Sequence, residues 1–188
     1  PVNIFAIDPV PGVGNVQAER IALAENVREY VGFYSRDERS KGFACVIPSV
    51  ASGTQICIYP MPGRHATLVG NASVDGASDG KVLKEPGLIV RHFAEVCLTR
   101  WGVQLGKRLA LNDSQLMQCH QAMAAAEAQY QAMRGNSYTV LTEGEKHDRL
   151  VHCGEARTHF SKVYGDDYEP TQGLALQRWD ASTYKALC

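Results

Sequence analysis

The stretch NIFAIDPVPGVGN, residues 3–15, places an acid at the end of a mostly apolar run and follows it at once with a proline-rich turn. Residues 2–7 have the composition of a strand in a parallel sheet that is covered on both faces. Asp8 then has two interpretations. Its carboxylate either hydrogen-bonds its own turn, as Asp commonly does, or serves as a catalytic acid at the carboxyl end of a strand, where open α/β sheets bind their ligands.

Composition limits the classes of protein to consider. The chain has 188 residues, of which 45% are hydrophobic, and this is enough for one substantial domain with its own core. The formal net charge is −1, which gives no electrostatic reason to expect nucleic acid or an anionic membrane as the main partner. The sequence shows neither an apolar run long enough to span a bilayer nor a signal peptide. We therefore expect a cytoplasmic protein, with export by a specialised secretion system as an extension of that expectation.

Six cysteines are scattered along the chain without a CxxC pair. They are Cys45, Cys57, Cys97, Cys119, Cys153 and Cys188. A disulfide framework is typical of shorter, loop-rich secreted chains. We therefore expect reduced, mostly buried thiols and folding in a reducing compartment.

Hydrophobic periodicity predicts an α/β front half and a mainly helical back half. We expect one α/β unit over residues 1–102 and a helical extension or lid over residues 103–188, packed on the same domain. The predicted strands cover residues 2–7, 43–48 and 54–60, and the predicted helices cover residues 16–34, 86–101, 114–134 and 144–165.

A second titratable side chain follows another predicted strand. In IYPMPGRHATLVGNASVDG, residues 58–76, His65 stands in a Pro-Gly turn, as Asp8 stands before its own prolines. The other five histidines lie on predicted helices, where histidine is usually solvated or packed. Because neighbouring parallel strands end at one edge of a sheet, we expect Asp8 and His65 to meet there. They suit the supporting roles of a hydrolytic triad, in which His moves a proton and Asp orients it.

The hydroxyl nucleophile of such a triad is missing. No G-x-S-x-G elbow occurs in the chain. Ser35 in GFYSRDERS lacks the flanking glycines and follows a predicted helix, so we do not assign it as the nucleophile. A cysteine nucleophile, Cys45 or Cys57 paired with His65, is a further hypothesis, although both lie within predicted strands and fit inert packing better.

Four segments together resemble the carboxyl-terminal half of a bacterial α/β-hydrolase group that includes type VI secretion phospholipase effectors. They are NIFAIDPVPG, VREYVGFYSRDERSKGF, YPMPGRHATLVGNAS and EPGLIVRHFAEVCLTRWG, within residues 1–102. Asp8 matches the catalytic acid of that group, and His65 in the Pro-Gly-Arg-His turn matches its base. Asp37-Glu38-Arg39 with Phe43 matches the segment between them.

The resemblance implies a secreted serine ester hydrolase, a lipase or phospholipase, whose serine precedes the acid strand. The chain opens inside a strand, and we expect it to be the C-terminal piece of a longer or two-piece hydrolase. Its expected partners are an N-terminal segment that carries the nucleophile, a lipid or ester substrate, a membrane surface and an inhibitor protein. We expect no cofactor, no metal and no nucleic acid. The alternative is a non-catalytic protein-interaction module with the same fold.

Smaller signals have competing interpretations. Residues 37–39 are either a charged lid element or a solvated helix end held by local ion pairs. The Met- and Ala-rich stripe of residues 116–133 is either core or an apolar lid. Two groups contain residue types that bind metals, but neither has a standard spacing. They are Asn71, Asp75 and Asp79 in a polar loop, and His147, His152, Cys153 and His159.

Overall fold

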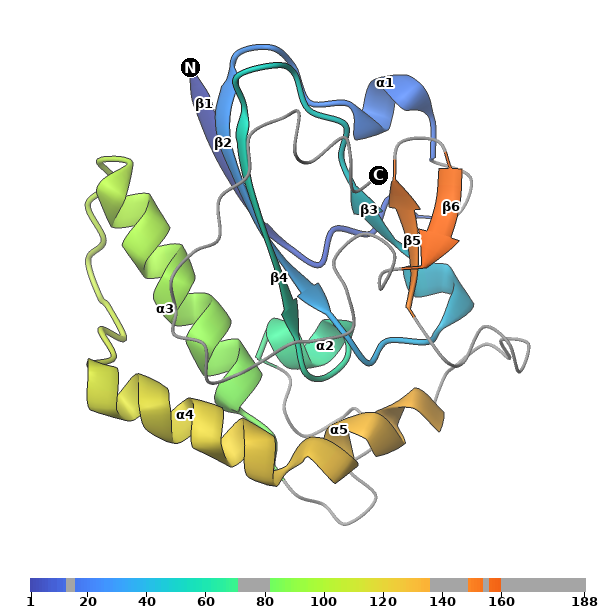
Figure 1. The fold of residues 1–188 in the computed structure, drawn as a ribbon. Coiled ribbons are helices and arrows are strands. Elements are labelled where there is room, and N and C mark those ends of the chain that lie inside the picture. The colour runs from blue at the N-terminus through green and yellow to red at the C-terminus, as the bar shows by residue number, and fades with distance from the viewer. Residues whose placement is uncertain (13–15, 71–81, 136–148, 154–155, 160–188) are drawn as a thin grey trace.

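A three-stranded parallel sheet is the central element of the computed structural model (Figure 1). The structure describes residues 1–12, 16–70, 82–135, 149–153 and 156–159. Strands β1 (Val2–Ile7), β2 (Val27–Ser35) and β4 (Gln55–Met61) lie in the order β1-β2-β4 and run in the same direction. The predicted α/β class with a parallel sheet is confirmed. Since the strands are parallel, their carboxyl ends all lie at the same end of the sheet, which we call its carboxyl edge.

Strand β2 lies in a segment for which periodicity predicts a helix, and that prediction is wrong. Only Ala18–Ile21 is helical (α1), whereas Val27–Ser35 forms the middle strand of the sheet. Every residue of β2 except Arg28 is buried. A central parallel strand covered on both faces loses its alternation and is rich in β-branched and aromatic residues. Apolar positions such as Val27 and Val31 therefore matched helical spacing without forming a helix.

Helix α3 (Glu85–Arg100) lies along one face of this sheet, and α4 (Asp113–Ala125) and α5 (Glu127–Ala132) run past the carboxyl ends of its strands (Figure 1). A final 3-10 turn, η2 (Met133–Gly135), follows α5, and these elements share one apolar cluster with the sheet. Pro86 lies in the first turn of α3, and Asn112 caps α4 by accepting the N–H of Gln115 at 2.9 Å. The helix predicted over residues 86–101 is confirmed, whereas the one predicted over residues 114–134 is divided at Ala126 into α4 and α5.

The Met- and Ala-rich stripe belongs to the core on this face. Leu116, Met123, Tyr130 and Met133 are buried in one apolar cluster with residues of β2, β4 and α3. The core interpretation of the stripe is therefore confirmed. Burying such side chains stabilises the fold by about 1.5–3 kcal/mol each.

A second, smaller sheet covers the opposite face. It contains β3 (Cys45–Ile47), β5 (Leu150–Cys153) and β6 (Ala156–His159) in the order β3-β5-β6, with β3 and β5 parallel and β6 antiparallel. Val151 packs with Tyr34 of the central sheet in the apolar cluster of this face. The order of layers is helices, central sheet and second sheet.

The helix predicted over residues 144–165 is wrong where the structure describes it. Arg149, Val151 and Cys153 are buried, and the residues between them, Leu150 and His152, are half-buried. This period of two is typical of a strand. The part of the chain after residue 102 is therefore not only a helical extension, because it also supplies two strands of the second sheet.

Four of the cysteines are buried free thiols, as predicted: Cys45, Cys57, Cys97 and Cys119. Cys153 is disulfide-bonded, so the prediction of six reduced thiols is wrong at that position. None of the helices in the described residues is long and apolar enough to cross a membrane.

Candidate active site

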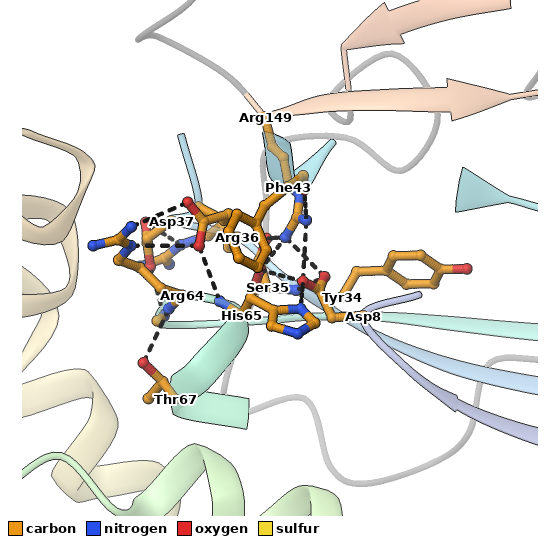
Figure 2. Close-up of polar contacts among 12 residues, drawn as sticks. Asp8, Tyr34, Ser35, Arg36, Asp37, Phe43, Arg64, His65, Thr67 and Arg149 are labelled. Carbon is orange, nitrogen blue, oxygen red and sulfur yellow. Dashed lines mark hydrogen bonds and ion pairs between the residues drawn. The ribbon is translucent and has the colours of Figure 1, made fainter. Parts of the chain in front are cut away.

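Asp8 and His65 lie side by side at the carboxyl edge of the central sheet (Figure 2). Nδ1 of His65 is 2.8 Å from Oδ2 of Asp8. Asp8 directly follows β1, and His65 begins the short helix α2 (His65–Leu68) just after β4. The predicted meeting of these two side chains is confirmed. They are not on adjacent strands, however, since β2 lies between β1 and β4.

The backbone of Asp8 is strained. Its φ is +46°, in the left-handed region that Asp and Asn tolerate better than most residues. Its N–H donates to the carbonyl of Phe33 at 2.7 Å, which extends the ladder between β1 and β2 by one residue. Strained conformations persist where the surroundings fix them, and they cluster at functional sites. Residues 9–12 donate no hydrogen bond to the Asp8 side chain, so the structure gives no support to the turn-forming interpretation.

The Asp8 carboxylate is buried and surrounded by donors. Oδ1 accepts the backbone N–H of Ser35 at 2.9 Å and lies 2.8 Å from Nη1 of Arg149. Oδ2 accepts the Ser35 hydroxyl at 3.0 Å and Nη2 of Arg149 at 3.1 Å, besides His65. Burial alone raises the pKa of Asp8, but Arg149, His65 and Ser35 together outweigh it and hold the pKa below its usual value. Asp8 is therefore a stable carboxylate at neutral pH.

His65 presents its second ring nitrogen outward. Because Asp8 accepts at Nδ1, the neutral imidazole carries its proton there and keeps the lone pair on Nε2. No hydrogen bond to Nε2 occurs within the described residues, and the His65 side chain is 29% exposed. The hydrogen bond to Asp8 raises the pKa of His65 above its ordinary value, although burial acts in the opposite direction. The ring also packs against Phe43, with centroids 5.1 Å apart.

Asp37 fixes the turn that carries His65. Its Oδ2 accepts the N–H of Gly63 at 2.8 Å, and its side chain is fully buried. Gly63 has a φ of +104°, and a Cβ there would lie 2.8 Å from Cβ of Thr67, so the turn requires glycine. The acidic segment is therefore a buried brace, and both predicted interpretations, lid element and solvated helix end, are wrong.

Glu38 supports the same turn from the other side. Its Oε2 accepts the backbone N–H of His65 at 3.3 Å and lies 3.4 Å from Nε of Arg64. Arg64 in turn donates to the hydroxyl of Ser40 at 2.9 Å. Burial raises the pKa of Glu38, but its bonds to Ser40 and the charge of Arg64 lower it more, so Glu38 is ionised. His65 is thus fixed through its backbone as well as through its ring.

Ion pairs connect the helical layer to this brace. Nε of Arg134, in the 3-10 turn η2, lies 2.7 Å from Oδ1 of Asp37. Nη2 of Arg36 lies 3.1 Å from Oδ2 of Asp37 and 2.9 Å from Oε1 of Glu127 at the start of α5. The position of the His65 turn is therefore coupled to the end of the helical segment.

Ser35 and Arg149 complete the site, although the sequence predicts a role in it for neither. Ser35 ends strand β2, so the expectation that it follows a helix is wrong. Its buried hydroxyl bonds Asp8 and Arg149, which makes it a holder of the carboxylate. Arg149 lies in a segment predicted to be helical. The alternation of RLVHC, residues 149–153, is the signal that would have placed its side chain on the buried face of a strand.

The two alternative nucleophiles are buried thiols, although Cys45 lies near Arg149 and Asp8. Burial raises the pKa of Cys45 to about 12, so its thiol stays protonated, and Cys57 is buried within β4. In the described ranges no three His, Cys, Asp or Glu side chains gather into a metal site. The remaining candidates, Asn71, Asp75, Asp79 and His147, lie outside those ranges.

The other histidines divide between two kinds of element. His92 and His120 lie on helices α3 and α4, as predicted. His152 and His159 lie on strands β5 and β6, so the helical prediction is wrong for these two.

The sequence matches no protein-family model and no curated protein. The chemistry of the site therefore rests on its own geometry.

Proposed function

We propose that this chain supplies the acid and the base of a serine ester hydrolase, with Asp8 and His65 in those roles. The observation that carries the proposal is the bond between a buried, ionised Asp8 and Nδ1 of a half-buried His65 whose Nε2 faces outward. This is the arrangement in which an imidazole accepts a proton from a hydroxyl. The resemblance to phospholipase effectors supports a lipid or phospholipid ester as the substrate.

The proposed reaction has two steps. A serine hydroxyl gives its proton to Nε2 of His65 while its oxygen attacks the ester carbonyl carbon, and Asp8 stabilises the imidazolium. His65 then returns the proton to the leaving alcohol, which departs as the acyl-enzyme forms. In the second step water gives its proton to His65 and attacks the acyl carbon, and the serine leaves with that proton.

The nucleophile is assigned to a segment that precedes Asp8. In the resembling group the serine lies before the acid strand, and no serine of the described residues bonds His65. Ser35 is fully buried and bonded to Asp8, so it does not compete for this role. The N-terminal segment that holds the serine is thus the first partner of this chain under the proposal.

One observation favours the second candidate, a non-catalytic interaction module. Arg149 pairs with both oxygens of Asp8, and a buried carboxylate with a guanidinium partner is also a common structural ion pair. In that case His65 would only cap the pair. The outward-facing Nε2 of His65 supports the hydrolase, because a purely structural cap has no need of exposure.

A fluorophosphonate serine probe on the native gene product, followed by peptide mapping, separates these candidates. The hydrolase predicts an adduct on a peptide upstream of Asp8, and His65→Ala should abolish the labelling while His92→Ala leaves it intact. An adduct on a serine of this chain would move the nucleophile here and keep the roles of Asp8 and His65. A folded protein without any adduct would contradict the hydrolase and favour the interaction module.

A further inference from the structure

Arg149 joins three segments at the candidate site. It lies next to strand β5 of the second sheet, and its guanidinium is buried. Nη1 and Nη2 approach the two oxygens of Asp8 at 2.8 and 3.1 Å. Nη1 also donates to the carbonyl and hydroxyl oxygens of Ser35, and Nη2 donates to the carbonyl of Phe43 at 2.8 Å. One side chain therefore bonds the ends of β1 and β2 and the 3-10 turn Lys41–Phe43, whose Phe43 ring packs on His65 (Figure 2).

Arg149 restrains the Asp8 carboxylate at both oxygens. Nη2 donates to Oδ2, and Nη1 lies 2.8 Å from Oδ1 while it donates to the oxygens of Ser35. Because the guanidinium is a rigid, planar fork, these contacts oppose rotation of the carboxylate. With Asp8 fixed in this way, Oδ2 stays directed at Nδ1 of His65. A lysine could supply the charge but not the fork.

The charge of Arg149 also acts on His65. Two acids favour the protonated imidazole: Asp8 from the end of β1 and Glu38 from the segment between β2 and β3. Arg149 opposes them from the position just before β5, and Arg64, on the His65 turn itself, is paired with Glu38. Removing the positive charge of Arg149 therefore leaves two carboxylates acting on His65 with one less cation opposing them.

The geometry points to Arg149 as a positioning residue that aims the Asp8 carboxylate at Nδ1 of His65 and holds a positive charge beside that carboxylate. The second sheet would thus act on the base through Arg149, which directly precedes β5 and contacts Asp8. The catalytic meaning of this role rests on the proposed function, but the contact and its effect on His65 do not.

The test is an NMR titration of His65 in the full chain, for the wild type and three variants. Arg149→Gln removes the charge and keeps a donor for Asp8. Arg149→Lys keeps the charge and loses the fork. Arg100→Gln is the matched control. Arg100 pairs with Glu29 at 2.6 Å, and this pair lies near the start of β2, away from the carboxyl edge. We expect the His65 midpoint to shift upward in Arg149→Gln and to stay at the wild-type value in Arg149→Lys and Arg100→Gln.

The orientation of the Asp8 carboxylate is measured separately from the effect of charge, through the tautomer that the ¹⁵N chemical shifts of neutral His65 report. Wild type should carry its proton at Nδ1, and Arg149→Lys should show a mixture of tautomers. The electrostatic role would be overturned by an unchanged His65 midpoint in a folded Arg149→Gln variant, or by a His65 midpoint that moves upward in Arg149→Lys. A single Nδ1 tautomer in Arg149→Lys would overturn the positioning role. If the Gln variant does not fold, the Lys variant decides both points.

These readouts need no substrate and no serine. Failure of the fluorophosphonate experiment therefore leaves them unaffected, and their own failure leaves the hydrolase proposal standing. If the hydrolase proposal and the role of Arg149 both hold, the acidic limb of the pH–activity profile should move to higher pH in Arg149→Gln.

Discussion

Two acids at opposite ends of the central sheet are both paired with arginine, and one of them, Asp8, also bonds an imidazole. Glu29, near the start of β2, lies 2.6 Å from Nη2 of Arg100 and accepts the indole N–H of Trp101 at 2.8 Å. These bonds tie the end of α3 to the sheet. At the other edge, Asp8 has the same kind of partner in Arg149, and in addition a half-exposed imidazole. Each acid–arginine pair connects the central sheet to another layer of the fold. At Asp8, the exposed Nε2 of His65 also provides a nitrogen that can accept a proton.

Among the substitutions that distinguish these two sites, a change of His65 should have the largest effect. His65→Gln should lower ester hydrolysis in the complete protein by on the order of 10⁶-fold, because the proton acceptor is lost. Its free energy of unfolding should change by only about 1 kcal/mol, since the ring is half-buried. His92→Gln, on α3, is the control and should retain activity. Activity that survives His65→Gln in a folded protein would remove His65 from the reaction.

Asp8→Asn should affect both activity and stability. Activity should fall by about 10⁴-fold through loss of the negative charge beside His65. Since Asn tolerates the left-handed backbone of position 8, stability should be lost only through the unpaired charge of Arg149, at a cost of about 3–5 kcal/mol in urea unfolding.

Acid titration checks the same residue. The pKa of folded Asp8 is below its usual value, so its stabilisation is present above the ordinary Asp pKa of 3.8 and is lost as the pH falls through the folded pKa. Asp8→Asn should weaken this acid-dependent loss of stability. An equally steep loss in the variant would show that other carboxylates cause it.

Asp37→Asn should sharpen the distinction between the base and its support. The Gly63 N–H would keep an acceptor, but Arg134 would lose its ionic partner, and the His65 turn would be less firmly held. A misplacement of about 1 Å costs about 10²-fold in activity. Steady-state kinetics should show this in kcat with KM little changed. A loss confined to KM would argue that Asp37 acts on substrate binding.

The pH profile of kcat/KM should have an acidic limb set by His65. Only the neutral imidazole accepts a proton, and the pKa of His65 is raised above 6.5, so activity should increase with pH through a midpoint above 6.5. Below that midpoint, activity should fall about tenfold per pH unit. A midpoint at or below 6.5 would contradict the hydrogen bond that His65 donates to Asp8 as the dominant influence on its pKa.

Glu29→Gln should have the smallest effect. Arg100 is partly exposed and regains water, so the variant should lose about 1 kcal/mol of stability by urea unfolding and none of its activity. A loss of activity comparable to that of Asp8→Asn would show that the two edges of the sheet are coupled.

Local sequence predicted the two residues whose position depends on their own strands. Asp8 and His65 each follow an apolar run and precede or occupy a proline-containing turn, and the parallel pairing of the strands brings them to one edge. The prediction failed at β2, where burial on both faces removed the alternation that marks a strand. The alternation of residues 149–153 could have shown that Arg149 is buried, but not its partner, because Asp8 is separated from Arg149 by 141 residues.

That long separation has a consequence for the order of assembly during synthesis. At about 5–20 residues per second, the ribosome needs roughly 7–28 s to extend the chain by the 141 residues that separate Asp8 from Arg149. During this interval Asp8 has no Arg149 with which to pair. Nascent chains stalled before residue 149 should therefore pair Asp8 and His65 only weakly, and the site should mature when β5 docks.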